Sequence, residues 1–87
     1  MDTPLAAAVK AATLAAEMAE WNAEQIAERA RRRMFLELAP RNAEEELRAK
    51  RRHYQNTHRI KEARIIAARL RARVKELEAA AAVDPLA

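Results

Sequence analysis

The chain contains no glycine, and only one of its three prolines, Pro40, lies away from the two ends. Glycine and proline are the residues that most readily break a helix, so a long uninterrupted stretch remains on each side of Pro40. Thr3 and Pro4 are typical of a helix start, and a proline disfavours helical geometry in the residue before it. The sequence therefore predicts a first helix over about 4–39.

The second helix is expected to begin with a strong capping signal. Asn42 can accept a hydrogen bond at a helix N-terminus, and Glu45 completes a pattern close to the capping box. Nothing then breaks the helix over about 43–82. Because the two helices are similar in length and the turn over about 40–42 is short, they are expected to pack antiparallel. We expect residues 1–87 to form a single domain.

Apolar residues follow a heptad pattern along each expected helix. Positions that alternate by three and four residues lie on one side of a helix, so they are expected to form a seam between the two helices. The seam consists of Leu5, Val9, Ala12, Ala16, Ala19, Ala23, Ile26 and Ala30 in the first helix, and of Ile60, Ala63, Ala67, Leu70, Val74, Leu77 and Ala81 in the second. The sequence thus predicts an all-α protein, an antiparallel two-helix hairpin similar to a coiled coil.

The seam becomes polar near the turn. Continuing the heptads of the second helix backward places Arg52 and Asn56 at seam positions, and a tight turn would set them against Ala30 and Ile26, respectively. A polar seam residue can fix the register of two helices at a cost in stability. Alternatively, this end of the hairpin opens and presents Arg52, Asn56 and Met34 to a partner.

A second apolar stripe lies on the face of each helix opposite the seam. It comprises Leu14, Met18 and Trp21 in the first helix, and Leu47, Tyr54, Ile65 and Ala72 in the second. A two-helix hairpin buries only one face of each helix. Alanine supplies 23 residues and buries little area in each, so a hairpin of this composition gains modest stability by itself. A homodimer in the form of a four-helix bundle is the simplest way to cover the stripe.

Basic residues gather on both sides of the expected turn, where an antiparallel hairpin brings them to one end of the rod. We name this cluster the basic elbow. Its members are Arg29, Arg31, Arg32 and Arg33 from the first helix, and Arg48, Lys50, Arg51, Arg52 and Arg59 from the second. The elbow is interpreted as a solvated surface with ion pairs such as Glu28–Arg32, Glu44–Arg48 and Glu46–Lys50, as a site for an acidic protein, or as a site for nucleic acid phosphates.

Several kinds of chemistry lack their residues in this chain. Without glycine there is no phosphate-binding loop, and without serine and cysteine the common acyl-transfer nucleophiles and thiolate metal ligands are missing. His53 and His58 lie on poorly aligned faces of a helix, with no carboxylate expected at a helical ligand spacing. The sequence predicts a protein that is not an enzyme and that uses no cofactor, metal or small-molecule substrate.

The expected function is binding. Neither a targeting signal nor a segment of about 18 uncharged apolar residues is apparent, so a cytoplasmic location without membrane contact is expected. We interpret the chain as a small helical adaptor, inhibitor or assembly factor that binds another protein through the basic elbow, the second stripe, or both. The alternative is a helical dimer that binds nucleic acid through the elbow arginines. A protein partner is favoured over nucleic acid because the aromatic content is low and because Glu24 and Glu28 lie near the elbow.

Overall fold

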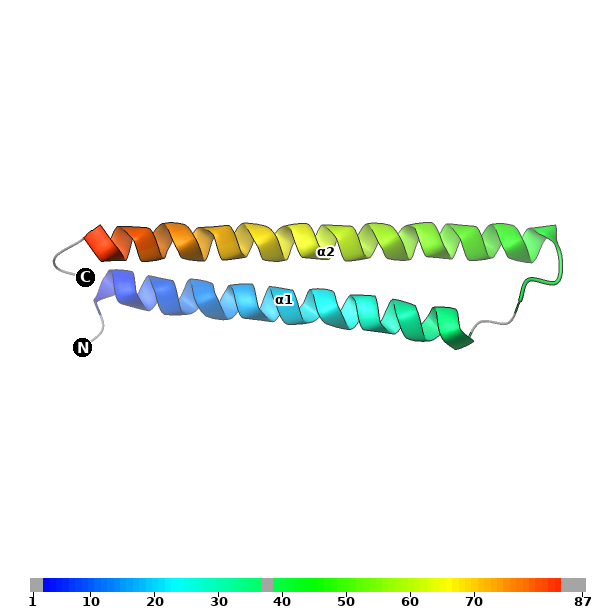
Figure 1. Cartoon of the computed structure of the whole chain (residues 1–87), viewed down its shortest axis with the longest axis horizontal. Helices are drawn as coiled ribbons and strands as arrows, with labels where there is room; N and C mark the ends of the chain where they lie inside the picture. Colours follow the sequence, from blue (N-terminus) through cyan, green and yellow to red (C-terminus); the bar gives the residue numbers. More distant parts are fainter. Residues whose placement is uncertain (1–2, 37–38, 84–87) are drawn as a thin grey trace.

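The computed structural model is an antiparallel hairpin of two long helices, α1 (Pro4–Leu36) and α2 (Ala43–Val83) (Figure 1). It describes residues 3–36 and 39–83, and within these ranges there is no strand. The hairpin is a rod with extents of 67 × 17 × 13 Å. The predicted all-α two-helix hairpin is therefore confirmed.

Both helices begin at the residues that the sequence indicates. The backbone amide of Ala6 donates a hydrogen bond to Oγ1 of Thr3 at 3.1 Å, which satisfies one free donor of the first turn. The amide of Glu45 donates to Oδ1 of Asn42 at 2.9 Å, and the Glu45 carboxylate accepts a bond from the amide of Arg41 at 2.8 Å. Glu45 thus reaches one residue further back than in the usual capping box, and the exchange still fixes the start of α2.

The first helix ends at Leu36 rather than near Ala39, which lies outside the helix. Pro40 has no amide hydrogen to donate to the carbonyl of Leu36, and its ring disfavours helical geometry at Ala39. Termination ahead of the proline follows from these two effects. The predicted helical positions 37 and 38 lie outside the described residues. The second helix ends at Val83, close to its predicted end.

Alanine fills most of the contact between the two helices. The buried apolar residues in the described part of the chain are Ala16, Ala23, Ala27, Ala30, Ala63, Ala67 and Val74. All of them except Ala27 belong to the predicted seam, and the other seam positions are half-buried. Small side chains let helix axes approach closely, but each one buries little apolar area. The seam is therefore narrow, and the apolar area buried in it is small.

The helices pair in a different register from the one that a tight turn predicts. Glu20 of α1 is hydrogen-bonded to Arg71 of α2, and Ala30 lines the same hollow as Ile60. In an antiparallel pair, these contacts place Ala30 about two helical turns away from Arg52. The expectation that Ala30 faces Arg52 is therefore wrong.

Ile26 lines a groove with Ala63, so its expected contact with Asn56 is wrong as well. The position of residues 39–42 explains this shift in register. Figure 1 shows that α2 begins beyond the point where α1 ends, because residues 39–42 lie further out along the rod. The first turns of α2 consequently project past α1 without facing it, and the two helices diverge toward this end (Figure 1).

One bidentate ion pair links the two helices. Nε of Arg71 donates to Oε2 of Glu20 at 3.2 Å, and Nη2 donates to Oε1 of the same carboxylate. These hydrogen bonds lower the pKa of Glu20; partial desolvation opposes them, and the guanidinium charge adds to them. They also raise the pKa of Arg71. Because both side chains are more than a third exposed, the pair contributes more to register than to stability.

We expect Glu20→Gln to lower the melting temperature slightly near neutral pH and to have no effect in strong acid. In the folded state the pKa of Glu20 lies below its ordinary value of 4.5. Its contribution to stability is therefore complete above pH 4.5 and is lost as the pH falls through the lowered pKa. Thermal melts followed by circular dichroism from neutral to acid pH measure this effect.

Glu24→Gln is the matched control, since Glu24 is exposed and forms no ion pair within the described residues. Its melting temperature should follow that of the wild type at every pH. If Glu20→Gln and Glu24→Gln have the same effect near neutral pH, the inter-helix pair does not contribute as described.

Candidate interaction surfaces

The structure brings the two halves of the basic elbow together at the open end of the rod. All nine residues of the elbow are exposed. Arg33 of α1 lines the same hollow as Arg52 and Arg59 of α2, which shows that the two arginine groups meet across the seam. Their role in binding stays a prediction.

Four of the nine elbow cations form ion pairs that neutralise part of the cluster. The pairs within each helix are Arg31–Glu28 at 3.2 Å, Arg32–Glu28 at 3.3 Å, Arg48–Glu44 at 2.8 Å and Lys50–Glu46 at 3.4 Å. Arg52 also interacts with a neighbouring group. The three predicted pairs between residues four apart are therefore confirmed. Exposed pairs of this kind contribute little to stability.

The remaining four elbow arginines form no ion pair in the part of the chain that the structure describes. They are Arg29, Arg33, Arg51 and Arg59. Each guanidinium presents up to five N–H donors in a fixed plane, which matches the geometry of a carboxylate or a phosphate. These four residues are the cations that an anionic partner would meet without first displacing a glutamate.

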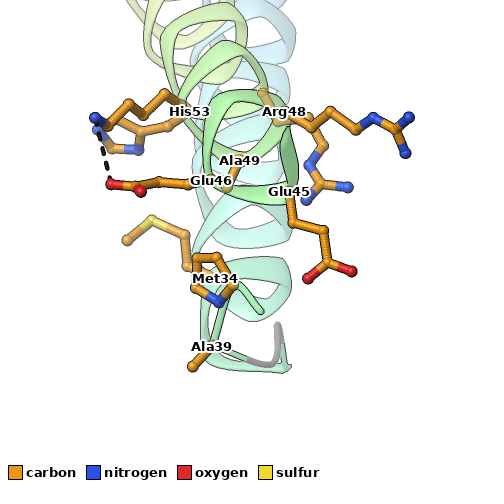
Figure 2. A pocket seen from close by; sticks show the side chains of 10 residues that line it. Met34, Ala39, Glu45, Glu46, Arg48, Ala49 and His53 are labelled. Carbon is orange, nitrogen blue, oxygen red and sulfur yellow. Dashed lines mark ion pairs between the residues drawn. The ribbon is translucent and has the colours of Figure 1, made fainter. Parts of the chain in front are cut away.

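A hollow of about 690 Å³ lies at the elbow, between the connection and the first turns of α2 (Figure 2). Its apolar wall is formed by Met34, Ala39, Pro40 and Ala49. The side chain of Met34 is 58% exposed although it lies near the helix contact. Figure 2 shows Met34 and Ala39 beneath the first turns of α2.

The rim of this hollow is polar. Arg48, Lys50 and His53 contribute basic or titratable groups, and Glu45 and Glu46 contribute carboxylates. Both carboxylates are already engaged, since Glu45 caps α2 and Glu46 is paired with Lys50 (dashed line in Figure 2). The hollow thus combines an apolar wall with a rim whose two carboxylates already have partners within the chain.

Asn56 is one of the two polar residues at predicted seam positions. It is half-buried, and its side chain forms no hydrogen bond within the described residues. It lines two separate hollows, one shared with Met34 and one shared with Arg52. These hollows lie where the two helices diverge (Figure 1), and the presentation of the three residues to a partner stays a prediction.

The second stripe is exposed on both helices. The exposed fractions are 58% for Leu14, 63% for Met18, 62% for Trp21, 51% for Leu47, 73% for Tyr54 and 41% for Ile65. Ala72 is exposed as well. Since each part of the stripe lies opposite the seam, the α1 part and the α2 part face away from each other. One flat partner surface therefore cannot cover both.

One histidine contact differs from expectation. Nε2 of His58 lies 3.0 Å from Oε1 of Glu62, four residues further on, so the expectation of no carboxylate at a helical ligand spacing is wrong. The His58 ring also stacks on Tyr54, with centroids 6.4 Å apart. The spacing of four residues was the available signal in the sequence. Among the described residues, no group of three or more His, Cys, Asp or Glu side chains could hold a metal ion.

Comparisons with known protein families, with curated proteins and with solved structures each gave no match. No family assignment follows, so the chemistry of the exposed surfaces is what indicates a function. Within the described residues, neither helix is both long enough and apolar enough to cross a membrane.

Proposed function

We propose that this chain is a small helical interaction protein, not an enzyme, that binds another protein through the basic elbow and its exposed apolar side chains. One observation carries the proposal: among the described residues, those that are fully buried are small, while many large apolar residues are exposed. Apart from Val74, the buried residues in this part of the chain are alanine. The exposed large apolar residues are Leu14, Met18, Trp21, Met34, Leu47, Tyr54, Ile65, Ile66 and Val83. Large exposed apolar patches usually mark interaction sites.

The accessible surface of the chain supports the same proposal. It measures 7367 Å², compared with roughly 5,200 Å² for a compact monomer of this mass by the usual size relation. The excess arises because a two-helix rod has no second layer to cover its outer faces. A standard interface covers roughly 800 Å² on each partner, which is well within this excess.

We propose that a second copy of the chain covers the α1 part of the stripe. In an antiparallel pairing about the centre of the stripe, Leu14 of one copy lies level with Trp21 of the other. The stripe is about half a turn away from the seam, so the four helices would lie in a row with α2 outermost. A four-helix bundle with its helices at the corners of a square would instead need a stripe about a quarter turn from the seam. Both elbows stay open in the row arrangement.

The chemistry of the elbow favours a protein over nucleic acid as the second partner. A nucleic acid backbone makes repeated phosphate contacts, and its bases stack on aromatic side chains. Among the side chains that the structure describes, Tyr54 is the aromatic residue near the basic cluster, and Glu28 and Glu44 lie within the cluster. An apolar side chain can occupy the hollow beside Met34 while acidic neighbours meet the arginines. A protein segment carries both kinds of group.

The test is capture from native extract by the immobilised chain, with and without nuclease. In the elbow variant, Arg31, Arg32, Arg51 and Arg52 are replaced by glutamine. In the control variant, Arg64, Arg69, Arg73 and Lys75 are replaced by glutamine, which removes the same charge from exposed positions outside the elbow. We expect the wild type and the control to retain a protein after nuclease treatment and the elbow variant to lose most of it.

Two results would contradict the proposal. Capture that disappears on nuclease treatment would indicate nucleic acid as the partner. An equal loss in the elbow variant and the control variant would show that only net charge matters. Both variants should keep the helical circular dichroism spectrum of the wild type, because the replaced side chains are exposed.

A further inference from the structure

A second hollow at the elbow, of about 330 Å³, is lined by arginines from both helices. Arg33 comes from α1, and Arg52 and Arg59 come from α2, where they lie about two turns apart. No carboxylate lines this hollow among the described residues. We name it the arginine hollow, defined by Arg33, Arg52 and Arg59.

Two of the three residues that define the arginine hollow, Arg33 and Arg59, lack among the described residues the glutamate partners that other elbow cations have. Arg32 and Arg48 each have a glutamate partner one turn away on the same helix. Arg33 and Arg59 form no ion pair within the described residues. Like charges that share one hollow repel each other, and an anion placed between them relieves that repulsion. The arrangement is therefore suited to an anionic group from outside the chain.

Neutral polar groups complete the lining. Asn56 lines this hollow, and its side-chain amide forms no hydrogen bond in the described part of the chain; Gln55 is a second amide residue in the lining. The stacked rings of Tyr54 and His58 form another part of the wall. Amide and guanidinium donors together can satisfy both oxygens of a carboxylate, and guanidinium–carboxylate pairs are commonly bidentate.

We propose that the arginine hollow binds carboxylate side chains of an acidic segment in the partner protein. This inference rests on the proposed function and names the chemistry that the elbow recognises. The hollow is small and has a single aromatic pair in its wall, so it suits short acidic side chains better than a run of stacked bases.

Two double variants with the same loss of charge test this site. Arg33→Gln with Arg59→Gln removes two arginines of the hollow. Arg29→Gln with Arg51→Gln removes two elbow arginines that are equally exposed and unpaired in the described residues but do not line it. Fluorescence anisotropy measures the binding of a labelled oligoglutamate peptide, with oligoglutamine and single-stranded oligothymidine as comparison probes.

We expect oligoglutamate to bind the wild type and oligoglutamine not to bind. The affinity for oligoglutamate should fall about tenfold or more in the hollow variant, because two charged hydrogen-bonding groups are lost, and by no more than about threefold in the other variant. Equal losses of affinity in the two double variants would contradict the proposal, because they would show that the peptide is attracted by net charge and not by the arginine hollow. The proposal would also be contradicted if oligothymidine bound more tightly than oligoglutamate and lost this binding in the hollow variant, because the hollow would then be a site for nucleic acid.

Capture from native extract by the immobilised chain, repeated with the hollow variant, separates this inference from the function on which it rests. If the hollow variant loses the protein that the wild type captures, the arginine hollow is supported. If the hollow variant still captures that protein, the arginine hollow is not its site, although the proposed function stands. If the wild type captures no protein after nuclease treatment, both fail.

Discussion

The Trp21→Glu variant is expected to sediment as a monomer of 9.9 kDa, whereas the wild-type chain should sediment at about twice that mass. Trp21 lies at the C-terminal end of the α1 stripe and is 62% exposed in the single chain, so a second copy would bury its indole. A carboxylate placed in that interface would lose its hydration without gaining a partner, which is among the most costly changes an interface can undergo. The dimer should therefore dissociate almost completely.

Two controls separate this effect from a general effect of added charge. Val83→Glu adds the same charge at a position that is 82% exposed and outside the α1 stripe, and it should remain dimeric. Trp21→Phe keeps an aromatic ring at the interface and should also remain dimeric. A wild-type chain that sediments as a monomer, with the fluorescence of a fully hydrated indole, would contradict the pairing through Trp21.

The dimer prediction bears on stability as well as on assembly. The hairpin buries mainly alanine, and small domains with little apolar burial are marginally stable by themselves. Covering Leu14, Met18 and Trp21 would add the burial of three large side chains in each copy. The melting temperature of the wild type should consequently rise with protein concentration, as it does for chains whose folding is linked to association.

The helices themselves could be predicted from the sequence because their signals are local. Thr3 and Asn42 cap the two helices through hydrogen bonds that span three residues, and Pro40 prevents Ala39 from joining the first helix. The seam follows from helical periodicity alone, and its predicted residues are buried or half-buried. Only the exact end of the first helix differed, because the effect of a proline extends back to the carbonyl four residues before it.

The register could not be predicted in the same way. It depends on how far the chain travels beyond Leu36 before it reverses, and a short polar connection carries little information about that distance. An alanine seam also allows several registers, since one small side chain fits against another almost equally well. The bond between Glu20 and Arg71 depends on this register, so it could not be predicted from the sequence either.

The hollows were beyond sequence reasoning for a related reason. They lie where α1 and α2 diverge toward the end of the rod that carries the basic elbow (Figure 1), and Met34 of α1 and Asn56 of α2 line one of them together. The arginine cluster was recognised from composition. Its division into paired residues and a hollow without carboxylates required the positions of Arg33 and Arg59 on facing helices.

Photo-crosslinking in cells tests the central claim, that the open elbow contacts another protein. A photoreactive amino acid is placed at Met34, which lines the elbow hollow, at Met18 in the α1 stripe, or at Ala80, which is exposed near the other end of α2. The adducts are separated by mass after nuclease treatment. Because each position reports on a different surface, the three adduct patterns assign a contact to each.

We predict that Met34 yields an adduct with a different protein, Met18 yields an adduct with a second copy of the chain, and Ala80 yields neither. The Met34 adduct should disappear when Arg31, Arg32, Arg51 and Arg52 are replaced by glutamine, while the Met18 adduct should remain. The account would be contradicted if Met34 and Ala80 gave the same pattern, or if the Met34 adduct consisted of nucleic acid.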